Sequence, residues 1–419
     1  MLRKLSVFLL IVSLMTLPAW AATTATDTPP STLGLSLEDC LKLGFANSLN
    51  LQKEAQNIKV VQENVKQAAA GFHPTVDYSV SHNKQTNATD DYNSGTVSVS
   101  LPLLNCGALS NSLRVALLEL DSAKEDERQV KLQLAYDIKA NFYGIWLKEQ
   151  QQAVAQASYD NLGQHYHNVE KYYQVGKKSK YELLEAESAW KEQKVEVISA
   201  KSDIALARLA LATLMGIDKD QEFQLSYNSS IQQIPDQITL TLIPLLEKAY
   251  QQRPDMIQVE QAIKIAQFNV KIAKSNLNPA LSLSGTRTDN SDEWQYVLSM
   301  NGKLYDGKVT ATKVKTAEET VTLAKIKAAK LRDSVRDNIQ RALQAIQVDL
   351  EKVSSYRANV ELAKEDLRMT EIRYNAGVAT IMDVKDRQLR LDKAQNNYYQ
   401  TVSSYLTDSA KLVLELGDD

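Results

Sequence analysis

The chain has 419 residues, of which 48 are lysine or arginine and 51 are aspartate or glutamate, and its formal net charge is −3. This balance excludes a protein that binds nucleic acid through a basic surface, because the phosphate backbone attracts a positive excess. Proline is absent from 103 to 234 and from 280 to 419. Helix breakers are therefore missing where a compact α/β enzyme domain would need them.

Residues 1–21 are predicted to be an export signal. The basic pair Arg3 and Lys4 precedes an apolar run at 5–14, and a small-x-small cleavage site ends at Ala21. The apolar run is shorter than the roughly 20 residues that a membrane-spanning helix needs. We therefore expect an exported mature chain rather than an N-terminal membrane anchor.

The mature chain is internally duplicated. A shift of 201 residues carries Tyr173 and Gly176 onto Tyr374 and Gly377, and related shifts align the flanking segments. A duplication of this length predicts two units of the same fold that pack side by side. The first repeat is expected at 22–216 and the second at 241–417, with a connector at 217–240 and a short tail at 418–419.

Each repeat contains a short helix followed by two predicted strands. In 294–304 the residues Trp294, Tyr296, Leu298 and Met300 alternate with polar ones, which gives one apolar and one polar face. Strands of about this length match transmembrane β-strands, although a soluble cap with one buried face would show the same alternation. Four strands cannot close a barrel, so strands that span a membrane must be pooled from several chains. The strands are expected at about 74–83, 95–104, 279–287 and 294–304.

A very long helical hairpin follows each pair of strands. The run 308–376 contains neither glycine nor proline, and at about 1.5 Å per residue its helix would extend roughly 100 Å. A glycine suited to a helix C-terminus, Gly176 or Gly377, precedes the returning helix in each repeat. The hairpins are expected at about 108–214 and 308–415.

This order of elements resembles the TolC family of outer-membrane efflux and secretion ducts. The resemblance covers nearly all of the mature chain and implies a mainly α fold with a small transmembrane β part. It further implies a trimer, in which three chains form a twelve-stranded β-barrel and a long α-helical tunnel. The most specific motifs are Tyr173-x-x-Gly176-x-x-Ser179-x-x-Glu182 and Tyr374-x-x-Gly377-x-x-Thr380-x-x-Asp383-Val384-x-Asp386.

The resemblance also implies functional residues at the periplasmic end of the tunnel, which closes as an iris in the family. Asp383 and Asp386 would form an acidic ring that attracts cations, and like-charge repulsion would raise some of the carboxylate pKa values. Tyr374 and Glu182 would make the closing contacts. Some members carry an arginine two residues after the second glycine, where this chain has Ala379. The lysines at 177, 178 and 180 are the alternative cations.

The expected function is that of a passive exit duct in the outer membrane of a Gram-negative bacterium. Such a duct serves a tripartite efflux pump or a type I secretion system, with a periplasmic adaptor and an inner-membrane pump of the resistance-nodulation-division, ABC or major facilitator type as partners. The cargo could be a drug, a metal ion or a secreted polypeptide. The alternative is a soluble periplasmic coiled-coil adaptor or tether without a pore.

We expect neither an enzyme nor a cofactor. The segment from Gly302 to Lys308 approaches a phosphate-binding loop, but Val309 stands where a serine or threonine is required. His165 and His167 are two residues apart on a helix and cannot bind one metal together, so a surface or packing role is expected. Cation binding is expected only at Asp383 and Asp386.

Overall fold

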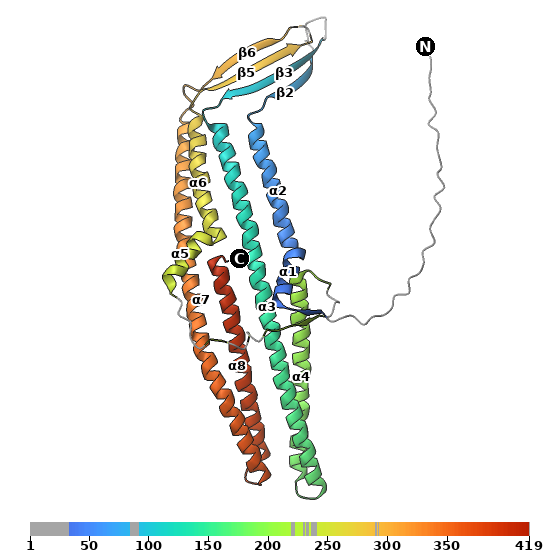
Figure 1. Ribbon diagram of the computed structural model, residues 1–419. Coiled ribbons are helices and arrows are strands. Elements are labelled where there is room, and N and C mark those ends of the chain that lie inside the picture. Colours follow the sequence, from blue (N-terminus) through green and yellow to red (C-terminus); the bar gives the residue numbers. More distant parts are fainter. Residues whose placement is uncertain are drawn as a thin grey trace, which may run out of the picture.

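The computed structural model describes residues 33–83, 92–218, 223–228, 231, 234–235, 241–289, 291 and 293–418 (Figure 1). The expected export signal and much of the connector lie outside them. The described chain is an elongated molecule with a small sheet at one end and two long helical hairpins at the other. Among these residues, no helix combines the length and the apolar character that crossing a membrane requires.

The two repeats contain the same elements in the same order. The first comprises α1 (Leu37–Asn47), α2 (Leu49–Ala70), β2 (Thr75–Asn83), β3 (Tyr92–Leu104), α3 (Ala108–Gln174) and α4 (Lys180–Met215). The second comprises α5 (Leu242–Gln252), α6 (Pro254–Ser275), β5 (Ala280–Thr288), β6 (Gln295–Asn301), α7 (Val309–Asn375) and α8 (Ile381–Leu416). Helices α3 and α7 each have 67 residues, and α4 and α8 each have 36. A constant shift of 201 therefore relates the two hairpins residue by residue.

Two helices precede each strand pair, whereas the sequence predicts one. In the first repeat the break falls at Ser48, whose extended backbone ends α1 and whose hydroxyl accepts a hydrogen bond from the Leu51 amide. In the second repeat the break falls at Arg253, because Pro254 restricts the residue before it to an extended conformation. Ser48 caps the N-terminus of α2 and Pro254 is the first residue of α6, so both breaks fall where a local residue favours the start of a new helix.

The sheet is antiparallel, in the order β2-β3-β5-β6, so that β2 and β6 are its edges. Val76, Val99, Gly285 and Tyr296 are opposed in one row across the four strands and therefore share a face. Large apolar side chains on the same face of the two edge strands are exposed: Val76, Tyr78, Val80, Tyr296, Leu298 and Met300. The sheet of a single chain thus has an apolar face, and each of its edge strands, β2 and β6, pairs with a neighbouring strand on one side only.

The last strand is shorter than expected and ends at Asn301 rather than at 304. Asn301 pairs with Ala280, and the residue before that partner is Pro279, which has no N–H group to continue the ladder. A Cβ atom on Gly302 would lie 3.2 Å from the Pro279 side chain. The chain therefore leaves the sheet at this point, and Leu304 is exposed.

The main core lies about halfway along the molecule, where the short helices pack against the long ones (Figure 1). Its fully buried residues include Ile138 and Ile145 of α3, Met215 of α4 and Ile339 of α7. At the same level β1 (Leu33–Leu35) pairs in parallel with β4 (Phe223–Leu225), a strand within the connector. This two-stranded sheet was not expected from the sequence.

Below the core, the four long helices lie side by side in the order α4, α3, α8, α7 (Figure 1). Helices α3 and α8 make the contact between the two hairpins, and the outer faces of α4 and α7 form the two flanks. Both hairpins run to the same end of the molecule. This order positions the two turns, and the motif residues in them, next to each other.

Candidate functional site at the tips of the helical hairpins

The two turns have the same backbone geometry. Gly176 and Gly377 both have a φ of 74°, a conformation that residues with a Cβ atom adopt at a cost. In each turn the amide of the residue after the glycine donates to a carbonyl of the preceding helix: Lys177 to Tyr172 at 2.8 Å and Val378 to Arg373 at 2.9 Å. These bonds satisfy carbonyls that a helix end leaves free.

The returning helices begin with matching capping boxes. In the first turn the Glu182 carboxylate accepts from the Ser179 amide at 2.9 Å, and in the second the Asp383 carboxylate accepts from the Thr380 amide at 2.7 Å. In each box the hydroxyl of the capping residue accepts a hydrogen bond from the backbone in return. Glu182 and Asp383 thus stabilise the N-termini of α4 and α8 at the two tips.

The predicted aperture residues lie one turn apart on the exposed surface of α8. Asp386 is exposed, three residues after Asp383, so both carboxylates project from one side of the helix. The pKa of Asp383 is lowered, first by the hydrogen bond from the Thr380 backbone and then by that from its hydroxyl. The repulsion that we expect to raise carboxylate pKa values requires a ring of chains and stays a prediction.

Tyr374 and Glu182 come to the same place, and Lys178 lies between them. The Nζ atom of Lys178 is 2.7 Å from Oε1 of Glu182 and 4.7 Å from the centre of the Tyr374 ring. The hydrogen bond with Glu182 is the main reason why the pKa of Lys178 is raised. The Tyr374 hydroxyl is buried and has no hydrogen-bond partner among the described residues. A direct Tyr374–Glu182 contact therefore stays a prediction for the assembled duct.

Lys178 stands two residues after the first glycine, and the shift of 201 places it on Ala379. The cation that some relatives carry after the second glycine is thus present here after the first. It joins the first hairpin to Tyr374 of the second by a cation–π contact. The sequence predicts this lysine as one of three alternative cations, and its contact with the Tyr374 ring distinguishes it from Lys177 and Lys180.

His165 of α3 packs against the same tyrosine. The ring centres of His165 and Tyr374 are 5.0 Å apart, and the Nε2 atom of the histidine is buried without a partner among the described residues. Burial, and secondarily the charge of Lys178, lowers the pKa of His165 to about 4. The imidazole is therefore neutral at pH 7 and fills the space between the hairpins, which agrees with the packing role expected from its spacing.

A cavity of about 210 Å³ lies beside this pair, between α3 on one side and α7 and α8 on the other. It is lined by Asn161, Gln388 and Glu371, and the amide of Asn161 donates to Oε1 of Gln388 at 3.4 Å. Burial raises the pKa of Glu371. Polar groups thus line the contact between the hairpins near their tips, whereas the contact half-way along the molecule is apolar.

Within the described residues, no group of three or more histidine, cysteine, aspartate or glutamate side chains is arranged to hold a metal ion. The tips offer the exposed carboxylates of Asp383 and Asp386 and a contact between the two hairpins at Lys178 and Tyr374.

Comparison with known proteins points to one family. The family model of the outer membrane efflux proteins matches residues 42–217 and 245–418, which are the two repeats. Nodulation protein T of Rhizobium leguminosarum bv. viciae is 22% identical over 391 residues, 90% of this chain and 81% of that protein. The outer membrane protein TolC of Vibrio cholerae serotype O1 is 20% identical over 365 residues, 82% of this chain and 81% of that protein.

Solved structures of outer-membrane channels share the fold. A CusC structure superposes with a TM-score of 0.82 at 16% identity, covering 95% of this chain and 96% of that one. The channel OprN superposes with a TM-score of 0.79 at 17% identity, covering 91% and 90%. These structures confirm the fold, and the family match confirms the resemblance and the location in the outer membrane of a Gram-negative bacterium. The chain belongs to the outer membrane efflux protein family.

Proposed function

We propose that the protein is a passive trimeric exit duct. The observation that supports this most directly is the four-stranded sheet, which has one apolar face, two unpaired edges and a pair of very long hairpins below it. At about 1.5 Å per residue, the 67 residues of α3 or α7 span roughly 100 Å. A sheet in the outer membrane would thus be connected to tips deep in the periplasm.

Closure of the barrel requires other copies of the chain. An unpaired backbone group in lipid costs several kcal/mol, so β2 and β6 cannot remain edges in a membrane. If β6 of one copy pairs with β2 of the next, three copies give a closed barrel of twelve strands. The exposed apolar side chains, Tyr296 and Leu298 among them, then face the lipid.

The tips would form the gate of this duct. Three copies bring together three pairs of Asp383 and Asp386, a ring of carboxylates that favours cations over anions. In each copy Lys178 holds Tyr374 of the second hairpin against Glu182 of the first. Opening would require the second hairpin to move away from the first and break these contacts.

The duct itself would perform no chemistry and bind no cofactor. Its energy would come from an inner-membrane pump, reached through a periplasmic adaptor that docks at the tips. Relatives bear names that refer to different cargoes, such as pyoverdine export and cation efflux. That range of names agrees with a common duct whose cargo is selected by the pump.

Membrane fractionation and bilayer recordings test the proposal against a soluble periplasmic tether. We expect the full chain in the outer membrane, released only by detergent as a trimer, and a conductance in planar bilayers that prefers cations. A tether would instead be released by osmotic shock as a protein without conductance. That result would overturn the duct.

A further inference from the structure

Asp349 of α7 is a carboxylate in the apolar core. The residue is 7% exposed, and its Oδ2 atom is buried without a partner among the described residues. Ile346, Leu350 and Val353, which lie beside it on the same helix, belong to the main core. A charged group in such surroundings is unfavourable unless it is paired or binds a metal ion. The described part of the chain supplies no such partner for this oxygen.

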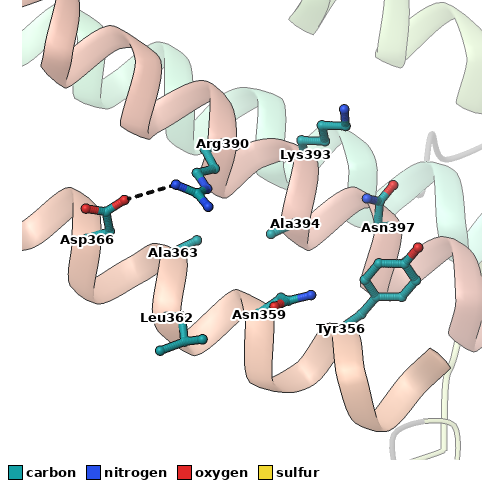
Figure 2. A pocket seen from close by; sticks show the side chains of 9 residues that line it. All are labelled: Tyr356, Asn359, Leu362, Ala363, Asp366, Arg390, Lys393, Ala394 and Asn397. Atoms are coloured by element: carbon teal, nitrogen blue, oxygen red, sulfur yellow. Dashed lines mark ion pairs between the residues drawn. The ribbon is translucent and has the colours of Figure 1, made fainter. Parts of the chain in front are cut away.

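Two contacts fix the register of α7 against α8 on either side of this carboxylate. Towards the tips, the guanidinium of Arg390 in α8 lies 3.6 Å from the carboxylate of Asp366 in α7 (Figure 2). Towards the sheet, the Asn338 amide of α7 donates to the Glu415 carboxylate of α8 at 3.3 Å. Antiparallel helices keep their register between two such contacts. The buried carboxylate therefore lies opposite residues 404–408 of α8.

Asp408 is the acidic residue of that turn. Burial raises the pKa of Asp349, and the charge of Asp408 is the second cause. Burial also raises the pKa of Asp408 itself. The pKa of Tyr136 in α3 is raised by burial and then by Asp408. Two carboxyl groups and a phenol from three helices thus meet at one level of the molecule.

Two lysines lie near the pair of carboxyl groups without closing on it. Lys352 and Lys411 are one turn further along α7 and α8, and both are exposed. Burial raises the pKa values of Asp349 and Asp408, and the charges of these lysines lower them by less. Neither lysine reaches the buried oxygen of Asp349. The pair therefore keeps a negative charge that a bound ion can neutralise.

The first repeat carries its own cation at the equivalent place. The shift of 201 carries Lys148 of α3 onto Asp349, and Asp203 of α4 onto Ser404 of α8. The Lys148 ammonium lies 2.9 Å from the Asp203 carboxylate. The side chain equivalent to Asp349 thus points towards the second helix of its hairpin and is positive. In the second repeat an anion replaces this cation, and a hydroxyl replaces its carboxylate partner.

We propose that Asp349 and Asp408 bind a hard divalent cation, calcium or magnesium, between α7 and α8. The two carboxylates match its charge, and the hydroxyl of Ser404, one turn before Asp408 on the same face of α8, is a further oxygen ligand. Oxygen ligands favour calcium and magnesium over metals that prefer imidazole or thiolate. The ion would take the place that the Lys148 ammonium has in the first repeat.

This site is distinct from the predicted acidic ring at the aperture. At about 1.5 Å per residue, Asp408 lies roughly 33 Å along α8 from Asp386. All its ligands come from one chain, so the site does not depend on the trimer of the proposed function. A cation there would tie α7 to α8 at the level of the main core, where α3 also contacts α8.

Thermal melts of the full chain in detergent test the site. The protein is freed of cations with a chelator and melted at pH 7 with the chelator, with calcium or with magnesium. An ion that binds only the folded chain raises the melting temperature, and we expect a rise of about 2–5 °C for the wild type. Asp408→Asn should abolish this rise. Asp337→Asn, at an exposed position of α7, is the matched control and should retain it.

Two further variants separate the site from the tips and from a simple loss of charge. Asp383→Ala with Asp386→Ala removes the aperture carboxylates and should keep the full response, with one ion bound per chain in isothermal titration. Asp349→Lys with Ser404→Asp copies the ion pair of the first repeat. It should melt at one temperature with and without calcium. If this variant does not fold, Asp349→Asn takes its place and should melt higher than the wild type in chelator, without any response to calcium.

Three results would overturn the site. The first is a wild type whose melting temperature ignores both ions, and the second is a calcium response that survives in Asp408→Asn. The third is a response to pH without a response to either ion, which would show that the two carboxyl groups share a proton instead. A trimer that conducts ions but gives one of these results would leave the duct of the proposed function intact.

Discussion

The ammonium of Lys178 lies 4.7 Å above the ring of Tyr374, and this contact joins the turn of one hairpin to the long helix of the other. The same ammonium is paired with Glu182, which caps its own helix. Position 379, equivalent to Lys178 in the second repeat, is an alanine. Lys178 of the first repeat thus joins the two tips at a place where the second repeat supplies no equivalent cation.

Replacing Lys178 by methionine should make the duct easier to open. A cation–π contact contributes about 0.5–2 kcal/mol, and a trimer would lose three of them. We expect a higher open probability in planar bilayers for Lys178→Met than for the wild type. Lys177→Met, at an exposed position of the same turn, is the control and should behave like the wild type.

Two changes at Tyr374 separate its ring from its hydroxyl. Tyr374→Leu removes the ring and should open the duct as Lys178→Met does. Tyr374→Phe should be silent if the ring contact alone closes the gate, and should increase opening if the hydroxyl meets Glu182 in the trimer. A Leu variant with wild-type conductance would remove Tyr374 from the gate.

Asp383 and Asp386 should both affect ion selectivity, but only Asp383 should also stabilise the helix tip. Both Asp383→Ala and Asp386→Ala should lower the cation preference of the duct, because each removes three carboxylates from the ring. Only Asp383→Ala should also loosen the tip, because loss of a helix cap costs about 1 kcal/mol. Hydrogen exchange of the amides at 380–384 measures this second effect. Equal exchange in the two variants would contradict the capping role.

Two glycines of α3 should respond oppositely to alanine. A Cβ atom on Gly163 would lie 2.9 Å from Nε1 of Trp190, which is stacked between Tyr159 and Tyr166. Gly163→Ala should therefore lower the thermal stability, by about 1–3 kcal/mol in the free energy of unfolding. Gly144→Ala meets no atom within 4 Å and should raise stability by about 0.5–1 kcal/mol. Thermal melts followed by circular dichroism measure both stabilities. A Gly163→Ala variant more stable than the wild type would contradict the close packing of Gly163 against Trp190.

Asp349 of α7 should make stability depend on pH. Its side chain is 7% exposed, one carboxylate oxygen has no partner among the described residues, and burial, with Asp408 second, raises its pKa. Because the folded-state pKa is above the ordinary value, Asp349 favours folding below about pH 4 and loses this contribution as the pH rises through the folded pKa. The charged form is thus a cost at neutral pH.

Asp349→Asn should therefore raise the melting temperature at pH 7 and leave it nearly unchanged at pH 4, with a gain of about 1 kcal/mol at the higher pH. Asp337→Asn, at an exposed position of the same helix, is the control. Equal melting temperatures of wild type and Asp349→Asn at pH 7 would show that the carboxylate finds a partner in the assembled duct.

Much of the fold follows from the sequence because its signals are long. The missing prolines, and in α7 also the missing glycines, indicate the long helices, and the alternation around Tyr296 indicates a strand. The three-residue strands β1 and β4 carry too few residues for a pattern, and their pairing joins segments far apart in the chain. The end of β6 depends on Pro279 of the neighbouring strand, which periodicity within β6 cannot reveal.

Only part of the candidate site at the tips could be predicted from the sequence. The turn motifs identify Gly176 and Gly377, and both take the same left-handed conformation. Which lysine meets Tyr374, and that His165 packs beside it, depends on how two helices are rotated against each other. The rotation of one helix against another cannot be predicted from a single sequence.

The equal lengths of the paired helices restrict how this protein can change. Removal of one residue from α3 but not from α7 would raise one tip by about 1.5 Å and turn every side chain beyond it by roughly 100°. The six tips of a trimer could then no longer meet at one level. Insertions and deletions in the hairpins should therefore be tolerated only in matched pairs.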